Sequence, residues 1–256
     1  MLRTALLVLL SAALSTFALA AELHVAAAAD LVYCLEDIDA AFKQQNPDAD
    51  IKVSTGSSGD FFAQIQHGGP YDVFLSADTS YPKKLAEAGF ANEKTLFRYA
   101  VGHLAIWTLD PKIDLGKGLA AVAQAQVTHL AIANPAHAPY GRAAQAALQQ
   151  AGVWDAVQPK LVMGENIAQT AQFVQSGNAD VGIVAYSLLK SPKLQGVGHY
   201  VLVPIDQFPT LEQAAIVTQH GADNPLAARY MAFLASPAAR AIFDRYGFSL
   251  PDNKTK

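Results

Sequence analysis

Cysteine is almost absent from this chain, because Cys34 is the only one among its 256 residues. No intramolecular disulfide can form, so the fold depends on a hydrophobic core, and 52% hydrophobic residues are ample for one. No basic residue neighbours Cys34 in the sequence. We therefore expect it to be a small buried side chain and not a nucleophile.

Clustered positive charge and metal-ligand patterns are also missing. The chain has 18 Lys and Arg against 22 Asp and Glu, a formal net charge of −4, and its basic residues form no cluster. Nucleic acid and anionic membrane surfaces are therefore poor partners. The seven His residues include no H-x-x-x-H pair and no Cys/His cluster, which argues against a zinc or copper site.

Long apolar runs are confined to the N-terminus, where the sequence has the features of a secretory signal peptide. Arg3 supplies a positive charge, the run from Leu6 to Leu14 is mainly apolar, and Ala18-Leu19-Ala20 is a small-residue cleavage site. We predict that residues 1–20 are a signal peptide cleaved after Ala20. The mature protein is then expected to be periplasmic. Because no Cys lies near the cleavage site, we do not expect a lipid anchor.

The rest of the chain alternates short apolar strands with amphipathic helices, which predicts an α/β fold with parallel sheets covered by helices on both faces. Extended runs from about Tyr99 to Trp107 and from Leu211 to Val217 interrupt this rhythm. We predict two lobes joined by these runs: lobe I from 21–98 and 216–256, and lobe II from 99–215, with a ligand cleft between them. The expected strands are Leu23–Ala28, Ile51–Ser54, Asp72–Leu75, Leu130–Ile132, Val181–Val184 and Tyr200–Val203, and expected helices include Leu31–Phe42, Phe61–His67, Pro82–Ala88, Tyr140–Ala151 and Ile167–Gln175.

Four predicted helix starts have the character of an anion site. The stretch Thr55–Asp60 joins a strand to a helix, so it presents free backbone N–H groups at the positive end of a helix dipole. An anion fits such a turn, although the same turn can equally act only as a helix cap. Similar junctions occur at Ala28–Asp30, Pro139–Gly141 and Glu165–Ile167. If two from each lobe converge, they would surround a tetrahedral oxyanion with donors and without Lys or Arg.

Several short motifs follow one another in a characteristic order. They are Ala27-Ala28-Ala29-Asp30-Leu31, Gly56-Ser57-Ser58-Gly59, Gln64-Ile65, the run from Asp72 to Asp78, Asn134-Pro135 with Pro139-Tyr140-Gly141, Gly182-Ile183-Val184, and the run from Ile242 to Phe248. Together, behind a signal peptide, they resemble the periplasmic molybdate-binding proteins of ABC importers. The resemblance covers essentially the whole mature chain. It implies a two-lobe type II periplasmic binding protein fold, with a mostly parallel sheet flanked by helices in each lobe.

The resemblance also implies which residues bind the oxyanion. Ser58 matches the family's ligand serine, through its hydroxyl and backbone N–H, and Ser57 precedes it in the same turn. Tyr140 matches a ligand in a loop of the second lobe, and Ile167 matches a backbone N–H donor. The metal centre of molybdate would be held only as the oxyanion, without a direct bond between protein and metal. No cofactor is implied.

Two positions depart from the family pattern. Asp30 stands where many members have a ligand serine, and Ala185 stands where some have a ligand tyrosine. A carboxylate facing a dianion repels it and must also be desolvated. We expect the Asp30 side chain to turn back and cap the helix from Leu31, which leaves only the N–H of Asp30 or Ala29 for the ligand. The alternatives are a protonated Asp30 or a different ligand. The Tyr140 hydroxyl would offset the loss at Ala185.

The leading hypothesis is a monomeric periplasmic solute-binding protein, not an enzyme, that captures molybdate and also tungstate. It would deliver them to an inner-membrane ABC permease by lobe closure and docking. Another oxyanion or small anion is the alternative within the same class. An exported serine hydrolase using Ser57 or Ser58 is a further alternative, but the motif is not G-x-S-x-G and the sequence assigns it no His or Asp partner. A sensory or adaptor protein with this fold is the remaining class.

Overall fold

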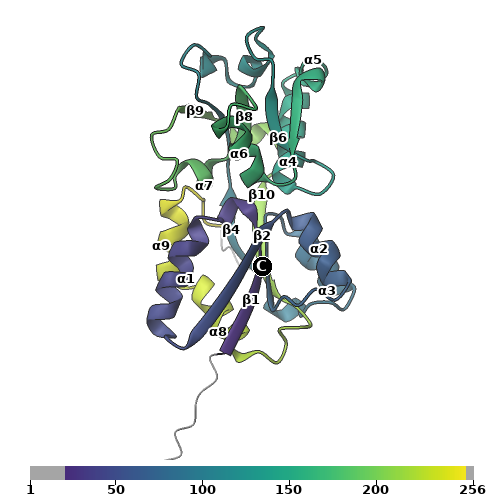
Figure 1. Ribbon diagram of the computed structural model, residues 1–256. Helices are drawn as coiled ribbons and strands as arrows, with labels where there is room; N and C mark the ends of the chain where they lie inside the picture. Colours follow the sequence, from purple (N-terminus) through teal and green to yellow (C-terminus); the bar gives the residue numbers. More distant parts are fainter. Residues whose placement is uncertain (1–20, 252–256) are drawn as a thin grey trace, which may run out of the picture.

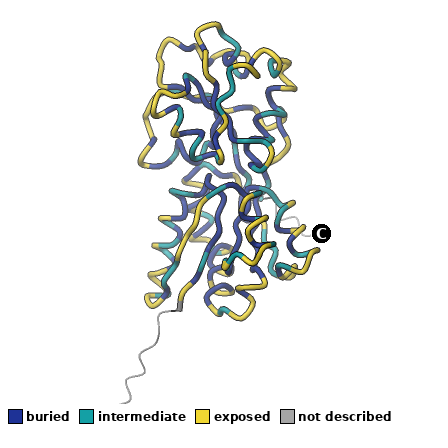
Figure 2. The backbone as a smooth tube through the Cα atoms, turned by 45° about the vertical axis from the view of Figure 1, so that its right-hand side comes forward, coloured by how far each residue is buried: buried dark blue, intermediate teal, exposed yellow. Residues whose placement is uncertain are grey.

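The computed structural model describes residues 21–251, which form two five-stranded sheets, one above the other in Figure 1. The predicted signal peptide and its cleavage site lie outside the described residues. Within residues 21–251, no helix combines the length and apolarity needed to cross a bilayer. Figure 2 shows mainly buried backbone through the middle of each half of the molecule, with exposed residues toward the outside.

The first sheet has the strand order β2-β1-β3-β10-β4. β1 (Ala21–Ala28) runs parallel to β2 (Ala49–Gly56) and β3 (Val73–Ser76), because helical crossovers connect these strands. β10 (Leu211–Val217) runs antiparallel to both β3 and β4 (Phe97–Gly102), so β10 alone is reversed. Successive residues such as Val25 and Ala26 belong to core clusters on opposite faces, as the period of two requires.

Helices cover both faces of this first sheet, which explains why its inner strands β1 and β3 are buried on both sides. One core cluster joins β1 to α1, α8 and α9, and the other joins it to α2 and α3. Figure 1 shows these two helical layers on either side of the sheet. The helices are α1 (Cys34–Gln45), α2 (Ser58–Gln66), α3 (Ser80–Glu87), α8 (Pro225–Leu234) and α9 (Pro237–Arg245).

The second sheet repeats this arrangement in the order β7-β6-β8-β5-β9. β6 runs parallel to β7 and β8, whereas β5 runs antiparallel to β8 and β9 and is the reversed strand. Its strands are β5 (Leu104–Thr108), β6 (Leu130–Ala133), β7 (Leu161–Gly164), β8 (Val181–Ala185) and β9 (His199–Leu202). Its α-helices are α4 (Pro139–Gln150), α5 (Trp154–Val157), α6 (Ile167–Gln175) and α7 (Tyr186–Leu189).

Short 3-10 helices occur in both halves of the molecule. They are η1 (Ala29–Leu31), η2 (Glu93–Thr95), η3 (Leu115–Ala123), η4 (Gln158–Lys160) and η5 (Ile205–Gln207).

The predicted α/β class with two mostly parallel sheets is confirmed, and so is the burial of Cys34, which is 1% exposed. The extended run predicted from Tyr99 to Trp107 is two strands in different sheets, with the crossing at His103. The predicted lobe boundaries at 98/99 and 215/216 therefore fall inside β4 and β10 of the first sheet. Periodicity did not reveal the crossing, because β4 and β5 are both apolar and only one residue separates them.

Among the other differences from the sequence-based expectation, two concern the cavity and the sheets. The helix expected from Leu31 begins at Cys34, after the short 3-10 turn Ala29–Leu31. Strand β7 was not predicted, because its four residues include the exposed Met163 and show no clear alternation. Neither difference changes the layers, but the first one decides where the Asp30 side chain goes.

Candidate functional site

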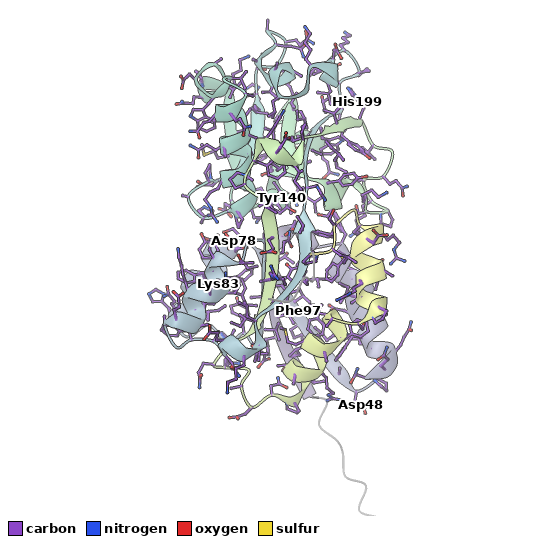
Figure 3. All side chains as sticks on the ribbon, turned by 180° about the vertical axis from the view of Figure 1, so that it is seen from behind. Asp48, Asp78, Lys83, Phe97, Tyr140 and His199 are labelled. Carbon is purple, nitrogen blue, oxygen red and sulfur yellow. The ribbon has the colours of Figure 1, made fainter. Side chains whose placement is uncertain are left out.

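A small cavity lies at the junction of the two sheets, beyond the carboxyl ends of their parallel strands. The centre of a water-sized sphere can occupy about 10 Å³ within this cavity. The cavity therefore has room for about one water molecule. All six predicted site residues line it together, and Figure 3 shows Tyr140 at the junction. We call the part built on the first sheet the first half of the molecule and the part built on the second sheet the second half. The lining residues are Ala28, Ala29, Asp30, Gly56, Ser57, Ser58 and Ala77 from the first half, and Ala138, Pro139, Tyr140 and Ile167 from the second half.

Three helices begin at this cavity, and they come from both sheets. α2 begins at Ser58, α4 at Pro139 and α6 at Ile167. N–H groups in the first turn of a helix have no acceptor within that helix, and the helix dipole adds positive charge there. Pro139 has no N–H, so Tyr140 carries the first donor of α4. No Lys, Arg or His is among the lining residues, so the positive potential at the cavity comes from neutral N–H groups and helix dipoles.

The two serines at the start of α2 have different roles. Ser57 is the N-cap residue, and its Oγ accepts a hydrogen bond from the Asp60 N–H at 3.2 Å. The Oγ of Ser58 accepts one from the Ala77 N–H at 3.0 Å. With that acceptor position occupied, the Ser58 O–H proton is free to be donated into the cavity. Ser57 thus performs the capping, and Ser58 keeps a donor for a guest.

The expectation that Asp30 caps the following helix is wrong. Its Oδ2 accepts hydrogen bonds from Gln213 Nε2 at 2.6 Å and from the Tyr140 hydroxyl at 3.1 Å. α1 begins only at Cys34 and has no side-chain cap. The 3-10 turn at Ala29–Leu31 separates Asp30 from the first turn of α1, so the carboxyl group faces β10 and α4 instead.

The surroundings of Asp30 favour its neutral form. The residue is 1% exposed, and burial raises the pKa of its carboxyl group to about 7, against the lowering effect of hydrogen bonds from Gln213, Tyr140 and its own backbone N–H. Within residues 21–251, its Oδ1 is the buried side-chain polar atom without a hydrogen-bond partner. The Asp30 carbonyl oxygen accepts a hydrogen bond from the Ser187 hydroxyl at 2.8 Å, which ties the turn to α7.

Gln213 and Tyr99 complete this buried network, and sequence reasoning missed both. The Tyr99 hydroxyl donates to Gln213 Oε1 at 2.8 Å, so the Gln213 amide group is oriented with its nitrogen toward Asp30. Gln213 is fully buried in β10, between the partly exposed Glu212 and the apolar run Ala214–Val217. Its alternation with Leu211 and Ala215 on one face of the strand was the available signal. Gly102 allows the close approach, since a Cβ there would lie 2.2 Å from the Tyr140 hydroxyl.

The two halves touch directly around the cavity. The Gly59 N–H donates to the carbonyl oxygen of His137 at 2.9 Å, and a Cβ on Gly59 would lie 2.5 Å from that oxygen. Arg142 of α4 forms an ion pair with Asp78, which follows β3, and also donates to the Tyr81 hydroxyl at 3.2 Å. The structure therefore has the two halves in contact, with the cavity enclosed between them.

Ser57, His137 and Asp60 lie close together, a grouping that the sequence did not reveal. His137 Nδ1 lies 2.9 Å from Ser57 Oγ and 3.5 Å from Asp60 Oδ2. A hydrolytic triad uses the two different ring nitrogens, one for the nucleophile and one for the carboxylate. Here the same nitrogen faces both residues. The grouping joins α2 to the loop before α4 and lacks the geometry of a proton relay.

The second departure from the family pattern is Ala185, which is not among the residues that line the cavity. Ala185 is fully buried at the end of β8. Tyr186 begins α7, and its ring packs against Tyr200 with 5.5 Å between the ring centroids. Tyr186 is not among the lining residues, so the tyrosine that lines the cavity is Tyr140.

Comparisons with known proteins agree with this fold. A family model described as bacterial extracellular solute-binding protein matches residues 23–249. The molybdate-binding protein ModA of Rhodobacter capsulatus is 39% identical over 231 residues, which cover 90% of this chain and 89% of that protein. ModA of Azotobacter vinelandii is 40% identical over 240 residues, 93% of each chain.

A solved structure extends this similarity to the arrangement of the sheets. The periplasmic molybdate-binding protein of Azotobacter vinelandii aligns with a TM-score of 0.83 and 33% identity, over 90% of this chain and 99% of that one. The match spans both sheets and therefore the junction between them. This chain belongs to the family of bacterial extracellular solute-binding proteins.

Proposed function

We propose that this protein is a periplasmic solute-binding protein that captures molybdate, and tungstate in the same way, and delivers it to an inner-membrane ABC permease. One observation carries the proposal: the N-termini of α2, α4 and α6, drawn from both halves of the molecule, begin at a single cavity lined without a basic side chain. The relatives named as molybdate-binding proteins support the choice of anion.

The donors available at this cavity suit a tetrahedral oxyanion. The Ser58 hydroxyl and the backbone N–H groups of Ser58, Tyr140, Ile167 and either Ala29 or Asp30 would each donate to an anion oxygen. Hydrogen bonds to an ionised acceptor are about twice as strong as neutral ones, more so where water is excluded. The anion's metal centre would then be bound only through its oxygens, and no side chain would ligate it.

Binding would involve movement of two lobes. The room in the closed cavity is about that of one water, whereas a tetrahedral oxyanion carries four oxygens, so the lobes have to part to admit it. We assign the lobes as predicted from the sequence, 21–98 with 216–256 against 99–215, but shift both boundaries so that β4 and β10 stay whole in lobe I. The hinges are then the crossings near residue 103 and between β9 and β10.

Capture and delivery require no catalysis, and we propose that the protein is not an enzyme. Ser57 and His137 lack the relay geometry of a hydrolase, as described above. Export by the N-terminal signal peptide, with cleavage after Ala20, would place the mature protein in the periplasm. There it would act as a monomer and present the closed lobes to the permease.

Calorimetric titration of the mature protein with molybdate, tungstate and sulfate tests the assignment. Saturable heat with molybdate and tungstate is expected. Heat with sulfate alone would favour the alternative of a different oxyanion, and no heat with molybdate or tungstate would overturn the assignment while leaving the fold intact. Ester hydrolysis that is lost in Ser57→Ala or Ser58→Ala would instead favour the hydrolase.

A further inference from the structure

One oxygen of the Asp30 carboxyl group accepts hydrogen bonds, and the other has no hydrogen-bond partner among the described residues. Oδ2 accepts two hydrogen bonds, from Gln213 and Tyr140, whereas Oδ1 has no partner among the described residues although it is fully buried. A buried polar atom without a partner is costly, so native structures rarely leave one. Asp30 also lines the cavity, so a guest of the cavity is what can complete its hydrogen bonding.

Within residues 21–251, no positive charge compensates Asp30. The side chains that contact it are neutral: Gln213 of β10, Tyr140 of α4 and, at its carbonyl oxygen, Ser187 of α7. The other titratable groups that feel its charge are Tyr99 of β4 and Cys34 of α1, and burial raises the pKa of both well above the ordinary values. The remaining cavity wall, from α2 and α6, is formed by Ser57, Ser58 and Ile167 and carries no charge.

A dianion beside Asp30 would strengthen this preference for the neutral form. An ionised Oδ1 would face an anion oxygen in a closed, poorly hydrated space, where like charges repel strongly. A protonated Oδ1 instead becomes a donor, and a short O–H···O⁻ bond is among the stronger hydrogen bonds. Because Gln213 and Tyr140 both donate to Oδ2, the proton belongs on Oδ1, the oxygen that accepts no side-chain hydrogen bond.

We propose, building on the proposed function, that Asp30 binds the oxyanion as a neutral carboxylic acid that donates its Oδ1–H to an anion oxygen. Above neutral pH, where Asp30 is ionised before binding, each captured oxyanion then brings up to one proton from solvent into the closed cavity, and that proton returns to solvent when the anion is released. Gln213 and Tyr140 act as positioning residues, because they hold Oδ2 as the acceptor and leave Oδ1 to carry the proton.

Affinity then depends on pH in a defined direction. The pKa of Asp30 is about 7 in the closed, anion-free structure, and a bound dianion raises it further. At a pH between the pKa of Asp30 without the anion and its higher pKa with the anion bound, the protein must take up a proton to bind. The association constant therefore falls by about tenfold per pH unit above neutrality and becomes flat at lower pH, where Asp30 is already protonated.

Proton uptake can be measured directly by calorimetric titration with molybdate at about pH 8 in buffers of different ionisation enthalpy. The expected result is an uptake approaching one proton per molybdate for the wild-type protein. Asp30→Asn keeps the shape and replaces the O–H with an amide donor, so we expect it to bind with no proton uptake and an affinity that does not change between about pH 6 and pH 9. Asp48→Asn, at an exposed loop position, is the matched control and should behave as the wild type.

Isotope-edited infrared spectroscopy of carboxyl-labelled aspartate gives a second readout that needs no variant to fold. Molybdate should increase the protonated-carboxyl signal in the wild type. Binding by the wild type without proton uptake and without this signal would overturn the inference and leave the proposed function standing. Loss of binding in a folded Asp30→Asn would also overturn it, because the carboxyl group would then be needed as an acceptor. No heat with molybdate or tungstate at any pH would be the failure of the proposed function instead.

Discussion

The hydroxyl of Tyr140 donates a hydrogen bond to Oδ2 of Asp30, 3.1 Å away and fully buried. This bond joins α4 of the second half to the turn that ends β1 of the first half, across a sequence separation of 110 residues. Gln213 Nε2 contacts both oxygens, at 2.6 Å from Asp30 and 3.2 Å from Tyr140. The three side chains form a buried polar cluster, and two of them, Asp30 and Tyr140, line the cavity from its two sides.

Tyr140→Phe is the most direct test of this cluster. Removing the hydroxyl deletes a donor to Asp30 and an acceptor for Gln213, and it loosens the closed arrangement. We expect molybdate binding to weaken by about tenfold, the equivalent of one buried hydrogen bond. The dissociation constant from calorimetry provides the measurement. Tyr200→Phe, at a 40% exposed tyrosine of β9, is the control and should leave it unchanged. An unchanged value in Tyr140→Phe would contradict the prediction.

Ser58→Ala tests the donor at the start of α2. The Ser58 Oγ already accepts a hydrogen bond from the Ala77 N–H, so the Ser58 O–H proton is free to be donated to the anion. The alanine variant loses this hydrogen bond to the anion. A hydrogen bond to a charged group contributes about 1.5–3 kcal/mol, so we expect affinity to fall by about 10- to 100-fold.

The matched control for Ser58→Ala is Ser54→Ala, at an exposed position of the preceding strand β2. It should bind molybdate as the wild type does. A Ser58→Ala protein with wild-type affinity would show that Ser58 has only a structural role, through its contact with Ala77. Thermal unfolding of both variants separates a loss of binding from a loss of fold.

Gly59→Ala tests the contact that closes the cavity. A Cβ at this position would lie 2.5 Å from the His137 carbonyl oxygen, so it would push the loop before α4 away from α2. Because alanine is the better helix former, α2 itself should not be destabilised. We expect weaker molybdate binding, together with a larger radius of gyration in the anion-bound state by small-angle X-ray scattering.

Ala63→Gly is the control for Gly59→Ala, because it changes the same helix at an exposed position away from the junction. It should lower thermal stability slightly and leave affinity unchanged. If Gly59→Ala closed around molybdate as compactly as the wild type, the contact with His137 would not limit closure.

Asp39 provides a test of stability against pH, away from the cavity. Burial raises the pKa of its carboxyl group to about 6, although the Tyr230 hydroxyl donates to it at 2.7 Å. The folded state therefore binds this proton more tightly than the unfolded chain does. That contribution to stability is complete below about pH 4 and is lost as the pH rises through about 6.

Asp39→Asn keeps an acceptor for Tyr230 and removes a partly buried charge. We expect the free energy of unfolding to increase by about 1–3 kcal/mol near pH 8 and to stay close to the wild-type value near pH 4. Urea unfolding at the two pH values provides the measurement. Asp48→Asn, at an exposed aspartate, should show no such difference. Equal stability of Asp39→Asn and the wild type near pH 8 would contradict the expected cost of this charge.

The sequence alone determined the α/β class, most strands and helices, and the helix starts that could bind an anion. These features follow from local chemistry: apolar periodicity, small residues at strand ends, and the free N–H groups of a first helical turn. Helix Ile167–Gln175 and strand Leu211–Val217 have the bounds that the sequence predicted. The motif order also pointed to the family to which the chain belongs.

Only the tertiary structure decided which of these local features act together. His103 separates two strands that read as one, because the change of sheet depends on pairing partners distant in sequence. Asp30 was expected to be a cap, and it became a buried acid because Gln213 and Tyr140 approach it from 183 and 110 residues away. Whether a carboxyl group is charged depends on its neighbours and its exposure to water. Those are properties of the packed molecule that no local stretch of sequence contains.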